Sequence, residues 1–201
     1  YGLKGVLQKI KKSADEESRV FAQNAEIVVD SIRNYAKRYA KAAKSKGFDK
    51  MASALEKVPY EPAYDLYSAL QSVWLMHMIA SCYVGERDYA FGRFDEYMLP
   101  FYEKAIADGA SREESTELLA RFFMKTNEIC GRGAWNYKAK PVLCQSSKQY
   151  VNIGGESPNE FSKIVLKNNE IKNDAFDTKN IILAKKLFDE TKNLNALELL
   201  A

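Results

Sequence analysis

Two short segments of this sequence gather charged and polar residues between apolar stretches. The first, residues 85–95, places five charged residues and two glycines in one connection. Charged groups there must reach water, one another or a ligand, because burying an unpaired charge is costly. Two interpretations stay open: a ligand site, or a helix N-terminus in which Asp95 lies in the first turn with Arg93 paired beside it.

The second segment, residues 144–155, is strongly polar and leads into the best strand candidate, Lys148–Ile153, which Gly154 and Gly155 close. A central barrel strand preceded by polar residues would line a cavity. A surface turn followed by an edge strand explains the same pattern equally well.

The remaining reactive residues favour structural roles. The single histidine, His77, lies in an apolar segment and is interpreted as a hydrogen-bonded core residue rather than a base. Three widely spaced cysteines make a poor disulfide framework and a poor metal site, and indicate reduced thiols in a cytoplasmic protein. The sequence contains no P-loop, dinucleotide fingerprint, zinc-ligand spacing or nucleophile elbow.

The composition sets further bounds. The chain has 201 residues, 46% hydrophobic and 28% charged, which is typical of a globular domain. A net charge of +3 is too small to indicate a nucleic-acid partner, and no apolar run is long enough to predict a membrane span. Because the first residue is Tyr1 rather than Met, we expect the chain to begin inside a longer natural sequence.

Apolar spacing predicts mostly helices. In the first long helix the expected apolar face contains Phe21 and Val28, and in the second, apolar nearly all round, Trp74 should lie in the most buried element. Ser111 and Glu114 form a capping box. The predicted helices cover residues 15–46, 50–57, 62–83, 93–108 and 111–128, with two more beginning near residues 157 and 178.

One clear strand among these helices cannot form a sheet by itself. The fold class is therefore mainly α. It is either an all-α domain or the helical portion of a larger α/β protein whose other strands lie outside the sequence.

Four blocks carry a resemblance to a known family. They are Ala69–His77, Gly92–Tyr102, Gln149–Gly155 and Asn159–Ser162, in order and with matching spacing. They resemble the N-terminal or internal part of glycyl radical enzymes of the pyruvate formate-lyase-like family. The resemblance runs over residues 1–167, a partial pyruvate formate-lyase-like domain, and leaves residues 168–201 as a divergent helical tail.

The resemblance implies an α/β barrel wrapped by helices and the chemistry of anaerobic metabolism. The family includes lyases, dehydratases and the formate acetyltransferase type of transferase. A partner activase, which uses S-adenosylmethionine and an iron-sulfur cluster, installs a radical on a backbone glycine. That radical oxidises a cysteine, whose thiyl radical attacks the substrate. No bound cofactor or metal is expected on this chain itself.

The sequence departs from the family where catalysis would occur. Neither the cysteine loop of Gly-Cys-x-Glu type nor the glycyl loop of Arg-Val-x-Gly-Tyr type is present. No catalytic residue is therefore assigned. By resemblance, the substrate-binding positions map to Arg87, Asp88, Ser146 and Lys148, with Arg87 as a clamp for a carboxylate or sulfonate.

Two functions stay open. The chain is an incomplete segment of a radical lyase or dehydratase acting on a small polar molecule, inactive alone. Alternatively, it is a stand-alone helical interaction or binding protein derived from that family. The expected partners are a substrate and a radical activase in the complete enzyme, with a homodimer as a further option and neither nucleic acid nor membrane.

Overall fold

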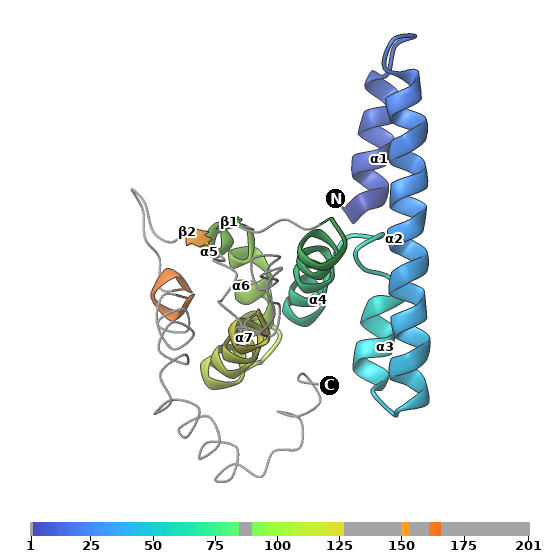
Figure 1. Cartoon of the computed structure of the whole chain (residues 1–201). Coiled ribbons are helices and arrows are strands. Elements are labelled where there is room, and N and C mark those ends of the chain that lie inside the picture. The colour runs from blue at the N-terminus through green and yellow to red at the C-terminus, as the bar shows by residue number, and fades with distance from the viewer. Residues whose placement is uncertain (1, 85–89, 127–149, 153–160, 166–201) are drawn as a thin grey trace, which may run out of the picture. The chain divides into compact units, whose positions relative to one another are not determined.

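The computed structural model describes residues 2–84, 90–126, 150–152 and 161–165 (Figure 1). Helices dominate these residues, which confirms the predicted fold class at that level. The chain divides into two compact units, Tyr1–Met76 and His77–Ala201, and each is described by itself. No helix among the described residues is long and apolar enough to cross a membrane.

The first unit is built around one long helix. Helix α2 (Arg19–Ser45) packs against α1 (Gly2–Ser13) and α3 (Asp49–Leu55), which lie one after the other along it (Figure 1). Gly47, at φ +83°, ends α2 in a conformation that other residues rarely adopt. The predicted helix and its glycine stop are confirmed, whereas the predicted start at residue 15 was early, because α2 begins at Arg19.

The buried face of α2 differs from the predicted one. It is mostly alanine, and consists of Ala22, Val29, Ile32, Ala36, Ala40 and Ala43. The side chains of Phe21 and Val28, which the apolar spacing placed in the core, are 64% and 56% exposed. Ile32 and Ala36, which belonged to the same predicted face, are buried as expected. The prediction was wrong for Phe21 and Val28, because a second stripe, shifted by one residue and mostly alanine, lets neighbouring helices approach α2 more closely.

The first turn of α1 is capped by backbone rather than by a side chain. The N–H groups of Leu3 and Lys4 donate to the carbonyl oxygens of Pro59 and Tyr60, each at 2.9 Å. These bonds satisfy donors that a helix start leaves without partners. Gly2 makes the approach feasible, because a Cβ at its position would lie 2.5 Å from the carbonyl carbon of Glu61.

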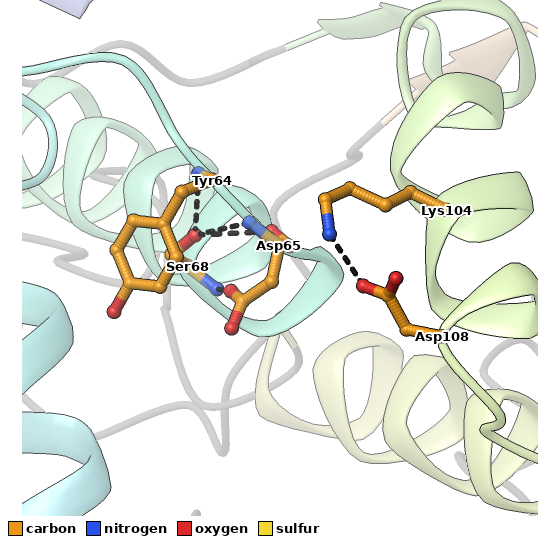
Figure 2. A network of polar contacts seen from close by, with 5 residues as sticks. All are labelled: Tyr64, Asp65, Ser68, Lys104 and Asp108. Atoms are coloured by element: carbon orange, nitrogen blue, oxygen red, sulfur yellow. Dashed lines mark hydrogen bonds and ion pairs between the residues drawn. The ribbon is translucent and has the colours of Figure 1, made fainter.

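Helix α4 (Leu66–Met78) begins at a reciprocal cap. The N–H of Ser68 donates to Oδ1 of Asp65 at 2.7 Å, and the N–H of Asp65 donates to Oγ of Ser68 at 3.1 Å (Figure 2). The predicted start at residue 62 was therefore early. None of the residues of α4 is exposed, although Trp74 is only partly buried. A π-helical segment, η1 (Ile79–Val84), continues the chain.

The second unit has an aromatic core. The rings of Phe91, Phe94, Phe122 and Phe123 contact one another at centroid distances of 5.3 to 6.4 Å. They come from β1 (Ala90–Arg93), α5 (Phe94–Tyr97) and α7 (Arg112–Thr126). Aromatic pairs in such edge-to-face, tilted and stacked arrangements add stabilisation beyond the area they bury.

The predicted helix over residues 93–108 is two helices. Arg93 ends β1, and α5 is separated by Met98 from α6 (Leu99–Ala107), with Pro100 in the first turn of α6. Proline is well tolerated there because first-turn N–H groups lack helical partners. Near its end, α6 carries an ion pair between Lys104 and Asp108 on its surface (Figure 2).

The predicted capping box of α7 is confirmed. The N–H of Ser111 donates to Oε2 of Glu114 at 2.8 Å, and the N–H of Glu114 donates to Oγ of Ser111 at 3.1 Å. The bond from the Ser111 N–H is the main reason why the pKa of Glu114 is lowered from its usual value.

The described residues contain two strands where the sequence predicted one. β1 pairs in parallel with β2 (Tyr150–Asn152), so that Ala90 faces Tyr150 and Arg93 faces Asn152. β1 was missed because it is short, its register is irregular between Ala90 and Gly92, and Gly92 has φ +64°. Such a strand shows no alternation of apolar and polar residues.

Candidate functional site

The four positions that the sequence analysis assigned to substrate binding precede the two paired strands in the sequence. Arg87, Asp88, Ser146 and Lys148 lie outside the described residues, as do Gly154 and Gly155. Their nearest described neighbours are the first residues of the strands. β1 begins two residues after Asp88, and β2 begins two residues after Lys148. Because the strands are parallel and Ala90 faces Tyr150, the chain enters both strands at the same end of the pair.

A buried carboxylate lies at the other end of β1. The side chain of Asp95, in the first turn of α5, is only 1% exposed. Its Oδ1 accepts a hydrogen bond from Nε of Arg93 at 3.2 Å, and its Oδ2 accepts one from Oγ of Ser162 at 2.8 Å. Both carboxylate oxygens are thus engaged, as a buried charge requires.

This contact fastens three segments together. Arg93 is the last residue of β1, Asp95 belongs to α5, and Ser162 lies in the helical residues 161–165. The interpretation of Arg93 and Asp95 as a paired helix start is confirmed. Ser162 was missed by sequence reasoning, because a serine 67 positions away carries no local signal of its partner. The arrangement makes Asp95 an anchor for the strand end rather than a candidate base.

His77 also lies against β1. Its ring is fully buried, with Nδ1 3.3 Å from Oγ of Ser81 and its centroid 4.9 Å from the ring of Phe91. Its interpretation as a hydrogen-bonded core residue is confirmed. His77 therefore supports β1 by packing against the ring of Phe91, which belongs to this strand.

Stacking fixes the position of the helical residues 161–165. Phe161 is buried and its ring stacks on that of Tyr102 in α6, with centroids 4.6 Å apart. Ser162 is thereby held where its hydroxyl reaches Asp95. Within the part of the chain that the structure describes, no three His, Cys, Asp or Glu side chains gather closely enough to hold a metal ion.

The arrangement is a helical segment that buttresses two parallel strands, with polar residues preceding both strands. The sequence pattern of the pyruvate formate lyase-like family matches residues 1–163. The chain belongs to this family, whose members include glycyl radical enzymes.

Known relatives agree with this assignment. Trans-4-hydroxy-L-proline dehydratase of Clostridioides difficile is 26% identical over 181 residues, which cover 80% of this chain and 22% of the dehydratase. Isethionate sulfite-lyase of Nitratidesulfovibrio vulgaris is 33% identical over 118 residues, which cover 51% of this chain and 14% of the lyase. The chain thus spans about a fifth of the length of these relatives or less.

A solved structure shows the same fold. The crystal structure of a glycyl radical enzyme from Archaeoglobus fulgidus matches with a TM-score of 0.65 and 29% identity, over 83% of this chain and 25% of that chain. The helices and the strand pair therefore correspond to a portion of a much longer glycyl radical enzyme fold.

Proposed function

We propose that this chain supplies part of the helical wall and two strands of the barrel in a glycyl radical lyase or dehydratase that acts on a small polar molecule. The family match over residues 1–163 carries this proposal. In it, residues 1–167 form the family part of the chain and residues 168–201 a divergent tail. The reaction would use a protein glycyl radical, installed by an activase that acts on the complete enzyme.

The 201 residues alone should have no turnover. The family's chemistry needs a glycine that stores the radical and a cysteine that becomes a thiyl radical. The sequence contains neither the cysteine loop nor the glycyl loop, and Cys144 precedes a strand and lacks the adjacent glutamate. The segment would therefore act on substrate only together with residues that supply both loops.

In this proposal Arg87, Asp88, Ser146 and Lys148 contribute to one substrate pocket. The parallel register supports it, because the chain enters β1 and β2 at the same end of the strand pair. A guanidinium there suits a carboxylate or sulfonate, which it can bind through two parallel hydrogen bonds. The names of the relatives point to small polar substrates, hydroxyproline and isethionate.

The decisive experiment is electron paramagnetic resonance after anaerobic incubation with activase, S-adenosylmethionine and reductant. The 201-residue chain should give no glycyl doublet, whereas a full-length trans-4-hydroxy-L-proline dehydratase with its own activase should give one. A doublet assigned to this chain would show that the polypeptide holds its own radical site, and the proposal of an incomplete segment would be abandoned.

The pocket is tested separately, in a complete enzyme into which residues 1–167 are grafted. Arg87→Gln should raise KM for an anionic substrate with little change in kcat, whereas Arg112→Gln, on the surface of α7, should change neither. If Arg87→Gln left KM unchanged, the clamp would be excluded.

A stand-alone interaction protein is the alternative, and one observation favours it. Val20, Phe21, Ile27 and Val28 leave α2 with an exposed apolar face. The coding sequence downstream distinguishes the two functions. A reading frame that continues into both radical loops supports the enzyme, and a stop codon after Ala201 supports the interaction protein.

A further inference from the structure

His77 contacts the elements on both sides of residues 85–89, which include two of the candidate substrate-binding positions. Its Nδ1 lies 3.3 Å from Oγ of Ser81 in η1, and its ring centroid lies 4.9 Å from that of Phe91 in β1. η1 is the last described element before residues 85–89, and β1 is the first one after them. One side chain therefore links the element that precedes these residues to the strand that follows them.

All three side chains of this contact are buried. His77 is fully buried, and Ser81 and Phe91 are only 4% and 5% exposed. A buried hydroxyl or ring nitrogen that loses its partner is costly, so the polar contact adds to what packing alone would provide. The ring of Phe91 also contacts the rings of Phe94 and Phe122, so the position of β1 depends on the aromatic core as well.

The contact between His77 and Ser81 spans a change of helix type. The chain is α-helical as far as Met78, where α4 ends, and π-helical in η1. Hydrogen bonds in a π-helix join residues five apart rather than four, so the wider turn changes the direction in which the chain continues. Such turns are frequent at functional sites. The contact thus holds the turn that directs the chain toward residues 85–89.

We propose that His77 is a positioning residue, which holds η1 and β1 together and so fixes the two elements that flank residues 85–89. A histidine suits this task because an imidazole offers a ring for Phe91 and a nitrogen for the hydroxyl of Ser81. Phenylalanine would keep only the ring contact. The consequence for substrate binding rests on the proposed function, because it requires that Arg87 contributes to the pocket.

Hydrogen exchange of backbone amides in the 201-residue chain tests the contact without any radical chemistry. His77→Phe and Ser81→Ala should each speed exchange in β1 about tenfold or more, and much less in α7, because a local loss of support opens the strand first. Circular dichroism checks that both variants keep their helices. Ser81→Ala is the milder change and decides the test if His77→Phe does not fold.

Thr126→Val is the matched control for this experiment. It also removes one buried hydroxyl of the second unit, which donates to the carbonyl oxygen of Phe123 at 2.7 Å in α7. Exchange in β1 should not be the part of the unit that this variant speeds most. If exchange in β1 stayed unchanged in Ser81→Ala, or rose equally throughout the unit, the proposal would be overturned.

A double variant tests whether the two residues act through each other. In Ser81→Ala the contact with His77 is already lost, so adding His77→Phe should speed exchange in β1 less than it does in the wild type. Equal effects of His77→Phe in the two backgrounds would show that the contact with Ser81 does not hold the strand, and would overturn the proposed link.

The consequence for the substrate is measured in the complete enzyme into which residues 1–167 are grafted. Ser81→Ala should raise KM for the anionic substrate about tenfold with little change in kcat, whereas Thr126→Val should change neither. An unchanged KM in Ser81→Ala, in an enzyme where Arg87→Gln raises KM, would overturn the positioning role. If Arg87→Gln also left KM unchanged, the proposed pocket would fail, and hydrogen exchange alone would decide whether His77 holds β1.

Discussion

The cores of the two units are built from buried side chains of very different size. In the first unit, α2 and its neighbours meet through alanines, and Ala36, Ala40 and Ala54 are almost fully buried. In the second, four phenylalanines fill the space between β1, α5 and α7. A small side chain gains its stabilisation through close approach of helix backbones, whereas a large one gains it through its own buried area.

The difference predicts opposite sensitivities. Where aromatic rings fill the core, removing atoms leaves a cavity and loses buried apolar area. Where alanines line the contact, little can be removed, but added atoms force the helices apart. The following substitutions test this contrast through the free energy of unfolding, in order of decreasing expected effect.

Phe94→Ala should have the largest effect. Phe94 is fully buried and contacts Phe91, Phe122 and Phe123, so truncation should destabilise the chain by about 3–5 kcal/mol. Urea unfolding followed by circular dichroism measures it. Tyr97→Ala is the control, because Tyr97 touches Phe94 but is 39% exposed, and it should cost much less. If Phe94→Ala and Tyr97→Ala lowered the free energy of unfolding equally, burial of large rings would not explain the stability of the second unit.

Ala40→Leu should reveal the opposite sensitivity in the first unit. Ala40 is 2% exposed on the buried face of α2, so three extra carbon atoms should cost about 1–3 kcal/mol. Ala42→Leu adds the same atoms to an exposed position on the same helix and should be nearly neutral. If Ala40→Leu were also neutral in urea unfolding, close approach would not explain the alanine face.

Asp95→Asn tests the polar anchor of the second unit. It removes the charge that Arg93 faces and changes one acceptor for a donor, at a cost of about 1–3 kcal/mol. Glu96→Gln changes the adjacent carboxylate, whose side chain is 70% exposed, and should be close to neutral. Chemical denaturation measures the free energy of unfolding of both variants. Equal values for Asp95→Asn and Glu96→Gln would show that the contact of Asp95 with Arg93 and Ser162 does not stabilise the end of β1.

Gly2→Ala tests backbone approach at the start of α1. The φ of +62° and the nearby backbone of residues 60–62 leave no room for a Cβ, so we expect a loss of about 1–2 kcal/mol. Gly5→Ala, within α1, should instead stabilise the helix by up to about 1 kcal/mol. The midpoint temperature of thermal unfolding should therefore fall for Gly2→Ala and rise for Gly5→Ala. A shift in the same direction for both variants would contradict the close backbone contact at Gly2.

The smallest effect concerns Glu114 and is best measured as a dependence on pH. Because folding lowers its pKa, ionised Glu114 stabilises the fold above the ordinary pKa of about 4.3, and this contribution disappears as pH falls through the lowered value. The stability difference between the wild type and Glu114→Gln should thus be larger at about pH 7 than at about pH 3. A stability difference that is no larger at about pH 7 than at about pH 3 would contradict the cap.

Local signals in the sequence were sufficient for most helices. The Ser111–Glu114 cap and the Gly47 stop act within a few residues, and both occur as expected. The buried face of α2 could not be chosen from the sequence alone, because α2 carries two apolar stripes and only the packing of α1 and α3 selects the alanine one.

The site was harder to predict because its contacts also join residues that are far apart in the sequence. The pairing of Arg93 with Asp95 is local and was anticipated, whereas the bond to Ser162 joins residues 67 positions apart. The strand β1 also depends on a partner far away in the sequence, since Ala90 pairs with Tyr150, and its own four residues include Gly92 at a positive φ. The pocket formed by Arg87, Asp88, Ser146 and Lys148 stays a prediction.

The parallel pairing of β1 and β2 also has a consequence for the order of events during synthesis. Helices α1, α2 and α3 find their partners within the first 62 residues, so they can pack while translation continues. β1 ends at Arg93 and its partner begins only at Tyr150. At about 5–20 residues per second, the ribosome needs roughly 3 to 11 s to make the intervening residues. During that interval the hydrogen-bonding groups on this edge of β1 cannot pair with β2, and an unpaired strand edge is a site of aggregation.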